Sequence, residues 1–361
     1  MPHSNLPPSS AARRVACPGS RALEAKYPET IESEASREGT AAHWLAQRYL
    51  LGDYEHYETA PNGEPITKEM REGADLYEHE IKWICNDPGQ LHIEERVDIS
   101  NVHPECWGTP DCWLVVNDTL HVFDYKYGHG YVDVFENWQM LEYAAGITQN
   151  VECNAIQMTI IQPRCYTVGG PVRSWTISVL GVQVYIDKLK DAEFLASQEN
   201  ALCVPSPQCS HCLGRHACTA LQRTVSRDLD VIKGYGNLEL TPVQTGLELT
   251  RLRAVAKLLD ARTTGLEEQA RSMITRGERV VGFKLESGQG REIWIKDAAE
   301  VITLGELMGL NLAKPPEAIT PLKARSLGLS DDILKAYSQK TSGKLKLIEE
   351  ANASRVFKKK D

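Results

Sequence analysis

Apolar and polar positions alternate in five stretches near the middle of the chain, and a period of two predicts β-strands. The predicted strands cover residues 91–99, 112–116, 120–126, 155–162 and 172–179. Other stretches place their apolar residues three and four positions apart, which predicts helices. These helices cover residues 11–16, 33–51, 67–86, 133–149, 182–200 and 242–276. Strands that alternate with helices predict an α/β fold.

The composition of the chain changes beyond about residue 226, where a long helical stretch is rich in Leu, Ala, Arg and Glu. A hairpin-like piece follows over residues 280–285 and 291–295, and short helices continue through Tyr337. We therefore predict a first domain at 1–225 and a smaller, mainly helical α+β domain at 226–361. The charged helices of the second domain could bind DNA or a partner protein. The alternative is that they only support the first domain.

Two neighbouring strands in the middle of the chain carry ionisable residues that are expected to converge. Side chains alternate between the two faces of a strand, so Asp124 and Lys126 share a face. Asp111 opens the preceding strand, and the turn at Asn117-Asp118 favours antiparallel pairing, which places Asp111 close to Asp124. Two adjacent carboxylates repel each other, so we expect a divalent metal ion that binds both and offsets the repulsion. The alternative interpretation is an ordinary Asp–Lys pair on a surface strand.

Charge and composition narrow the classes of function. The 361 residues carry a net charge of −9 and have a pI of about 5.7, which argues against nucleic-acid binding through a broad basic surface. A nuclease is not excluded, because metal ions and a local basic channel hold DNA in enzymes that are acidic overall. No apolar run is long enough to cross a membrane, and the first residues lack the pattern of a secretion signal. We therefore expect a cytoplasmic protein without a membrane partner.

Four short motifs follow one another in a characteristic order. They are Gly39-Thr40-Ala41-Ala42-His43, Gly108-Thr109-Pro110-Asp111, Asp124-Tyr125-Lys126 and Gln139-Met140-Leu141-Glu142-Tyr143. In this order they resemble the PD-(D/E)XK nuclease superfamily, and specifically its RecB-like branch. The resemblance covers about residues 9–225 and implies the core of that superfamily, a mixed central sheet flanked by helices.

The resemblance also implies an activity and a metal site. We expect a metal-dependent deoxyribonuclease, an exonuclease that hydrolyses phosphodiester bonds in phage or bacterial replication or recombination. Its partners would be single- or double-stranded DNA ends and proteins of those processes. His43, Asp111 and Asp124 would bind Mg²⁺ or Mn²⁺. Glu94 and Glu95 are equal candidates for a further contribution, and the sequence leaves the choice between them open.

The remaining motif residues are expected to act on the phosphate. Lys126 would orient the nucleophile or stabilise the negative charge that develops on the phosphate. Gln139 and Tyr143 are four residues apart, so they lie on one face of their helix. They would hydrogen-bond a phosphate or position Lys126, and the alternative is a plain polar helix face.

Ten cysteines in a chain without an export signal do not indicate a disulfide framework. Three of them, Cys209, Cys212 and Cys218, have the short gaps that let a tight loop aim several sulfurs at one centre, which is typical of a soft metal. One interpretation is a zinc ion whose fourth ligand is local. The candidates for that ligand are His211, His216 and Cys203.

The other interpretation adds a cysteine from the far end of the domain. Several RecB-like nucleases carry a 4Fe-4S cluster with one cysteine before the nuclease motifs and three after them. Cys17, with Cys209, Cys212 and Cys218, is similar to this split arrangement. The resemblance therefore favours a structural 4Fe-4S cluster that ties the two ends of the domain together.

Two other functions are compatible with the sequence. A catalytically inactive relative would bind DNA without cutting it, and a zinc-stabilised interaction protein would carry the Asp-x-Lys motif by coincidence. The nuclease is favoured because His43, Asp111, Asp124 and Lys126 are all present.

Overall fold

The computed structural model describes residues 6–27, 34–85, 88–167, 169–233 and 240–285, together with position 303. By its internal contacts the chain divides into one unit at Met1–Ser287 and another at Gly288–Asp361. Within the described residues, 280–285 form no strand, and the other half of the predicted hairpin lies outside them, as do the short helices predicted to run through Tyr337. The predicted domain boundary after residue 225 therefore stays a prediction.

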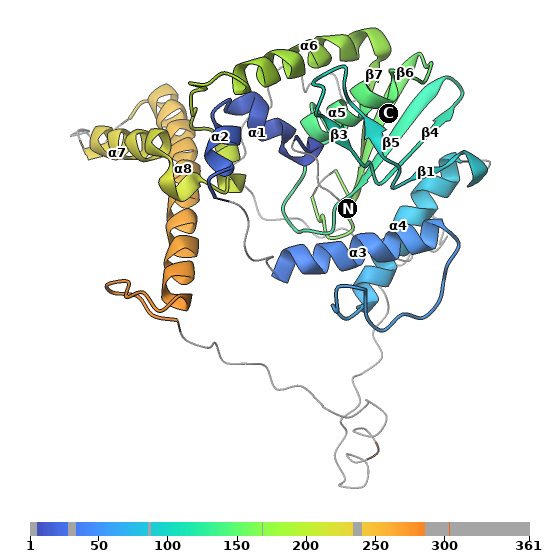
Figure 1. The fold of residues 1–361 in the computed structure, drawn as a ribbon, viewed down its shortest axis with the longest axis horizontal. Helices are drawn as coiled ribbons and strands as arrows, with labels where there is room; N and C mark the ends of the chain where they lie inside the picture. Colours follow the sequence, from blue (N-terminus) through green and yellow to red (C-terminus); the bar gives the residue numbers. More distant parts are fainter. Residues whose placement is uncertain are drawn as a thin grey trace. The chain divides into compact units, whose positions relative to one another are not determined.

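The first unit contains a five-stranded mixed sheet (Figure 1). Its strands follow the order β1-β4-β5-β6-β7, and among these the β5–β6 pair is parallel while the other pairs are antiparallel. They are β1 (His92–Ile93), β4 (Cys112–Val116), β5 (Thr119–Tyr125), β6 (Ala155–Ile161) and β7 (Val172–Ser178). A separate antiparallel pair consists of β2 (Val97–Asp98) and β3 (Trp107–Gly108). The predicted α/β class is confirmed.

Helices form much of the rest of the described chain, and some of them cover the two faces of the sheet. The longer ones are α3 (Glu34–Leu50), α4 (Lys68–Ile84), α5 (Trp138–Ile147), α6 (Val179–Ala196), α7 (Thr219–Lys233) and α8 (Pro242–Thr275). The shorter ones are η1 (Pro8–Ser10), α1 (Ala11–Ala16), α2 (Ser20–Glu24), η2 (Pro88–Gln90), η3 (Pro207–His211) and η4 (Arg215–Ala217). None of the helices in the described part of the chain is long and apolar enough to cross a membrane.

The alternation along β5 separates the core into two layers. Leu120 and Val122 belong to a cluster with apolar residues of α5 and α6. Phe123 and Tyr125 belong to a second cluster with residues of α3 and α4, on the other face. This division follows from the period of two in a strand. Asp124 lies on the same face of β5 as Leu120 and Val122, so its side chain is on the α5 side of the sheet.

The prediction of one continuous strand over 91–99 is wrong. Residues 92–93 pair with β4, whereas residues 97–98 pair with β3 in the separate sheet. Between them Glu94 has a φ of +50°, in the left-handed region that a strand cannot contain. The alternation predicted from the sequence runs through this break, but burial does not follow it, because residues 94–96 are all exposed.

Helices α5 and α7 also differ from the sequence prediction. Helix α5 begins at Trp138 and not near residue 133, because the Asn137 side chain accepts a hydrogen bond from the Met140 amide and caps it there. The residue before the cap, Glu136, has a φ of +52° and cannot extend the helix. Helix α7 was not predicted, and its sequence begins directly after Cys218.

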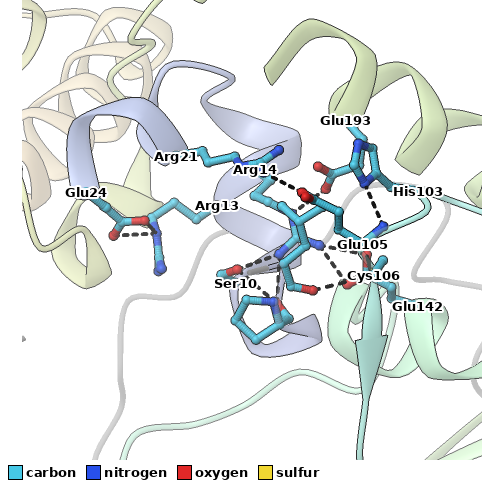
Figure 2. Close-up of polar contacts among 12 residues, drawn as sticks. Ser10, Arg13, Arg14, Arg21, Glu24, His103, Glu105, Cys106, Glu142 and Glu193 are labelled. Atoms are coloured by element: carbon cyan, nitrogen blue, oxygen red, sulfur yellow. Dashed lines mark hydrogen bonds and ion pairs between the residues drawn. The ribbon is translucent and has the colours of Figure 1, made fainter. Parts of the chain in front are cut away.

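A buried arginine joins three helices (Figure 2). Arg14 in α1 donates two hydrogen bonds to Glu142 of α5, at 2.7 and 2.9 Å, and also pairs with Glu193 of α6. All three side chains are at most 3% exposed. Because Cys17 follows α1 directly, this ion triad fixes the position of that cysteine relative to α5.

We expect Arg14→Met to lower the free energy of unfolding by about 3–5 kcal/mol, since it leaves two buried carboxylates without their cation. Chemical denaturation measures the change. The matched control is Arg21→Met, which removes a partly exposed 3.0 Å pair with Glu105 and should cost less than about 1 kcal/mol. Equal small losses in the two variants would contradict a stabilising role for the triad.

Candidate metal and cysteine sites

The β4–β5 hairpin brings Asp111 and Asp124 together at its open end. Cys112 pairs with Phe123 across the hairpin, so the next residues outward are Asp111 and Asp124. The Tyr125 amide donates a hydrogen bond of 2.6 Å to Asp111 Oδ2, which holds this carboxylate against β5. The predicted antiparallel pairing is confirmed, and with it the convergence of the two carboxylates.

Lys126 connects the hairpin to helix α5. Its Nζ lies 2.9 Å from Asp124 Oδ1 and donates a hydrogen bond of 3.2 Å to Gln139 Oε1. Gln139 Nε2 in turn lies 3.5 Å from the Tyr143 hydroxyl oxygen. The residues of the last two motifs therefore form one chain of polar contacts, from the end of β5 to the buried side of α5.

A histidine from α3 completes the group on the other side of Asp111. His43 Nδ1 lies 3.6 Å from Asp111 Oδ2, and its ring packs edge to face on Tyr125 at a centroid distance of 5.3 Å. His43, Glu94 and Asp111 each offer a ligand atom within 4.8 Å of the other two. Asp124 lies beside this trio and is bound to Lys126. The side chains of His43 and Asp111 are 32% and 18% exposed, so the trio is open to solvent.

The structure distinguishes the two glutamates that the sequence left equal. Glu94 lies at the site, where its backbone amide donates to the Asp111 carbonyl at 3.2 Å. Glu95 instead pairs with His92 at 2.5 Å on the exposed side. The break in the strand at Glu94 determines which of the two glutamates lies at the site. The hydrophobic pattern of the sequence does not show this break.

The site holds an excess of negative charge, of which Asp124 is the buried part. Partial burial, followed by repulsion from Asp111, raises the pKa of Glu94 to about 7. Burial likewise raises the pKa of Asp124, although Lys126 opposes it. Burial also acts against the charged form of Asp111, but His43 and Lys126 outweigh it and hold the pKa of Asp111 below its usual value. Three carboxylates thus face one ammonium and one imidazole.

This set of donors fits a divalent metal ion. Carboxylate oxygens and an imidazole nitrogen are ligands of Mg²⁺ and Mn²⁺. Asp124 is 2% exposed, and its Oδ2 has no hydrogen-bond partner within the described residues. A buried carboxylate oxygen without a partner is costly unless a cation compensates it. His43, Glu94, Asp111 and Asp124 are therefore the residues that could hold such an ion.

A second candidate site is formed by cysteines that are far apart in the sequence. Five of them line one small cavity: Cys17, Cys203, Cys209, Cys212 and Cys218. Cys17 ends α1, Cys203 follows α6, and the other three lie in or next to η3 and η4. Helix α8 covers this region, where its Ala261 packs in one cluster with Cys209 and Cys218.

Backbone amides point at the sulfurs of this cavity. The amides of Val204, Ser206 and Leu221 donate to the sulfurs of Cys17, Cys209 and Cys218, at 3.2, 3.3 and 3.4 Å. Burial, together with the neighbouring thiols, raises the pKa of Cys203 to about 12, and burial raises that of Cys212 to about 12 as well. A bound cation would favour the thiolate forms of Cys203 and Cys212 against this effect of burial.

The lining of the cavity bears on the zinc interpretation. Of the three candidates for a local fourth zinc ligand, Cys203 lines the cavity. Among the described residues that line the cavity, neither His211 nor His216 is present. The His216 ring packs instead on Tyr27 at a centroid distance of 4.5 Å.

Comparison with known protein families gives a match over nearly the whole chain. Residues 3–353 match the model of a family described as "Protein of unknown function (DUF2800)". The match covers both the hairpin with its carboxylates and the cysteines of the cavity. The chain therefore belongs to this family.

Proposed function

We propose that the protein is a metal-dependent deoxyribonuclease of the RecB-like PD-(D/E)XK type. The observation that carries the proposal is the convergence of Asp111, Asp124 and Lys126 at the end of one hairpin, next to His43. A mixed sheet that carries two carboxylates and a lysine at the edge of a β-hairpin also agrees with the core of that superfamily. DNA ends, and proteins of replication or recombination, are the proposed partners.

The proposed metal is Mg²⁺ or Mn²⁺, held by His43, Asp111 and Asp124, with Glu94 as a further ligand. When bound, such an ion would neutralise charge on the phosphodiester and lower the pKa of water. The surplus of carboxylates supports this proposal, because a cation offsets their mutual repulsion.

Lys126 is the proposed stabiliser of charge on the phosphate. An ammonium group has three N–H donors, and Asp124 and Gln139 engage two of them. The third is left for a phosphate oxygen. Both Asp124 and Asp111 hold the proton on Lys126, since they raise its pKa although burial acts to lower it. Gln139 and Tyr143 are proposed to position this ammonium.

The proposed cofactor of the second site is a 4Fe-4S cluster on Cys17, Cys209, Cys212 and Cys218. The presence of Cys17, from the far end of the domain, in the same cavity as Cys209, Cys212 and Cys218 supports this proposal. Its role would be structural, because it would link α1 to the segment before α7.

The function is tested with end-labelled single- and double-stranded DNA, with and without Mn²⁺. We expect metal-dependent cleavage by the wild-type protein, and a loss of a hundredfold or more, on the order known for one preorganised electrostatic group, in Lys126→Ala. DNA affinity should change little. Lys126→Arg should rescue poorly, because a planar guanidinium does not replace a compact ammonium.

The matched control is Lys82→Ala, which removes an exposed lysine of α4 that pairs with Glu78 and should leave cleavage unchanged. If the wild-type protein cuts neither single- nor double-stranded DNA in the presence of Mn²⁺, the proposed nuclease function is refuted. If Lys126→Ala weakens DNA binding but leaves single-turnover cleavage at saturating DNA intact, Lys126 is a docking residue and not a catalytic one.

A further inference from the structure

An irregular loop joins the two halves of the proposed nuclease site. Residues 127–137 form neither helix nor strand, and they lead from Lys126 at the end of β5 to the cap of α5. Because Lys126 Nζ donates to Gln139 in the first turn of α5, the loop has to return its two ends to within hydrogen-bond distance. A loop with glycines at 128 and 130 has many other conformations available to it.

One buried side chain holds this loop. Gln162 follows β6 and is 0% exposed. Its Nε2 donates to the carbonyl oxygens of Gly128 and Gly130, at 2.6 and 2.7 Å. Its Oε1 accepts from the Val132 amide at 3.3 Å and from Arg173 at 2.7 Å. A primary amide has two donors and two acceptor positions, so every one of them is used.

Arg173 of β7 supports this amide from behind. It is 7% exposed, and its guanidinium donates to the carbonyl oxygens of Gly170 and Val132 as well as to Gln162. The backbone adds a further link, because the Lys126 amide donates to the Ile161 carbonyl at 2.9 Å. Gln162 therefore lies beside the strand end that carries Lys126 and holds the loop that leads away from it.

We propose that Gln162 is a positioning residue, which sets the distance between Lys126 and Gln139 by fixing residues 128–132. The expected effect on the cleavage rate rests on the proposed nuclease function. The clamp itself, which is the set of hydrogen bonds between Gln162 and residues 128–132, does not. Removing the amide takes away the protein partner of two loop carbonyls and one loop amide, so the loop adopts other conformations. Lys126 then loses its contact with Gln139, and a displacement of about 1 Å is enough to slow a reaction on the order of a hundredfold.

The first test measures the loop itself and requires no activity. In Gln162→Leu, which has a similar size but no hydrogen bonds, hydrogen exchange of the amides in residues 128–132 should become at least about tenfold faster. The matched control is Thr159→Val in β6, which removes a part-buried 2.8 Å hydrogen bond to Ser174 of β7, away from the loop. Unchanged exchange in the loop of Gln162→Leu would overturn the proposal.

The second test measures the consequence at the site. Single-turnover cleavage at saturating DNA should fall about ten- to a hundredfold in Gln162→Leu, with DNA affinity unchanged and Thr159→Val like wild type. In the Gln162→Leu background, Gln139→Ala should cause less than about a threefold further loss, because the contact it removes is already broken. Full additivity of the two substitutions would overturn the positioning role, since general destabilisation predicts independent effects.

A second variant covers the case in which Gln162→Leu does not fold. Gln162→Glu keeps the shape and the acceptor for Arg173 but donates nothing to Gly128 and Gly130, so it should show the same fast exchange and slow cleavage. Wild-type behaviour of this variant would overturn the proposal. If wild-type protein does not cleave DNA at all, the nuclease function fails, while the exchange experiment still decides on the clamp.

Discussion

Asp111→Asn is expected to lower the rate of metal-dependent DNA cleavage at least about a thousandfold. This is the upper range for the loss of one preorganised electrostatic group. Asp111 is the carboxylate shared by the whole site: it lies beside His43, Glu94 and Asp124. An amide of the same shape keeps an oxygen for the Tyr125 amide, so the fold should persist. Cleavage assays with Mn²⁺ and calorimetric titration of Mn²⁺ measure the two effects.

The chain offers a matched control one residue from the site. Glu95→Gln removes a carboxylate that pairs with His92 at the surface, and it should leave both cleavage and Mn²⁺ binding at wild-type level. Glu94→Gln, by contrast, should weaken Mn²⁺ binding. Unchanged Mn²⁺ affinity in Asp111→Asn would refute the proposed ligand set, even if cleavage is lost.

Cys17→Ser is expected to remove the iron–sulfur cluster. Protein purified without oxygen should be brown and contain iron and sulfide, and the variant should be colourless and yield less soluble protein. The physical reason is that Cys17 is the ligand at the end of α1, whereas the other three lie in or next to η3 and η4. Without it the cluster no longer fastens α1 to the segment before α7.

Two further cysteine variants make this test specific. Cys165→Ser replaces a buried cysteine that already contacts the Thr167 hydroxyl, and it should keep its iron. Cys203→Ser removes the fifth sulfur of the cavity and should also keep the cluster. Loss of iron in Cys203→Ser but not in Cys17→Ser would reverse the ligand assignment. A stoichiometric zinc content without iron or sulfide would refute the cluster.

The sequence alone was sufficient for the central part of the site. The alternation over residues 120–126 placed Asp124 and Lys126 on one face, and the turn at Asn117-Asp118 predicted the pairing that brings Asp111 to them. The helical spacing of Gln139 and Tyr143 likewise predicted their common direction. These relations are local, because the backbone geometry of a strand, a turn or a helix determines them within a few residues.

The remaining features depended on the tertiary structure. The choice of Glu94 over Glu95 followed from a positive φ that interrupts a regular alternation, which no pattern of polarity records. The cover of the cysteine cavity by α8 joins segments on either side of the predicted domain boundary. Gln162 was invisible in the sequence for a related reason: its partners are carbonyl and amide groups of a distant loop, and backbone groups are the same at every position.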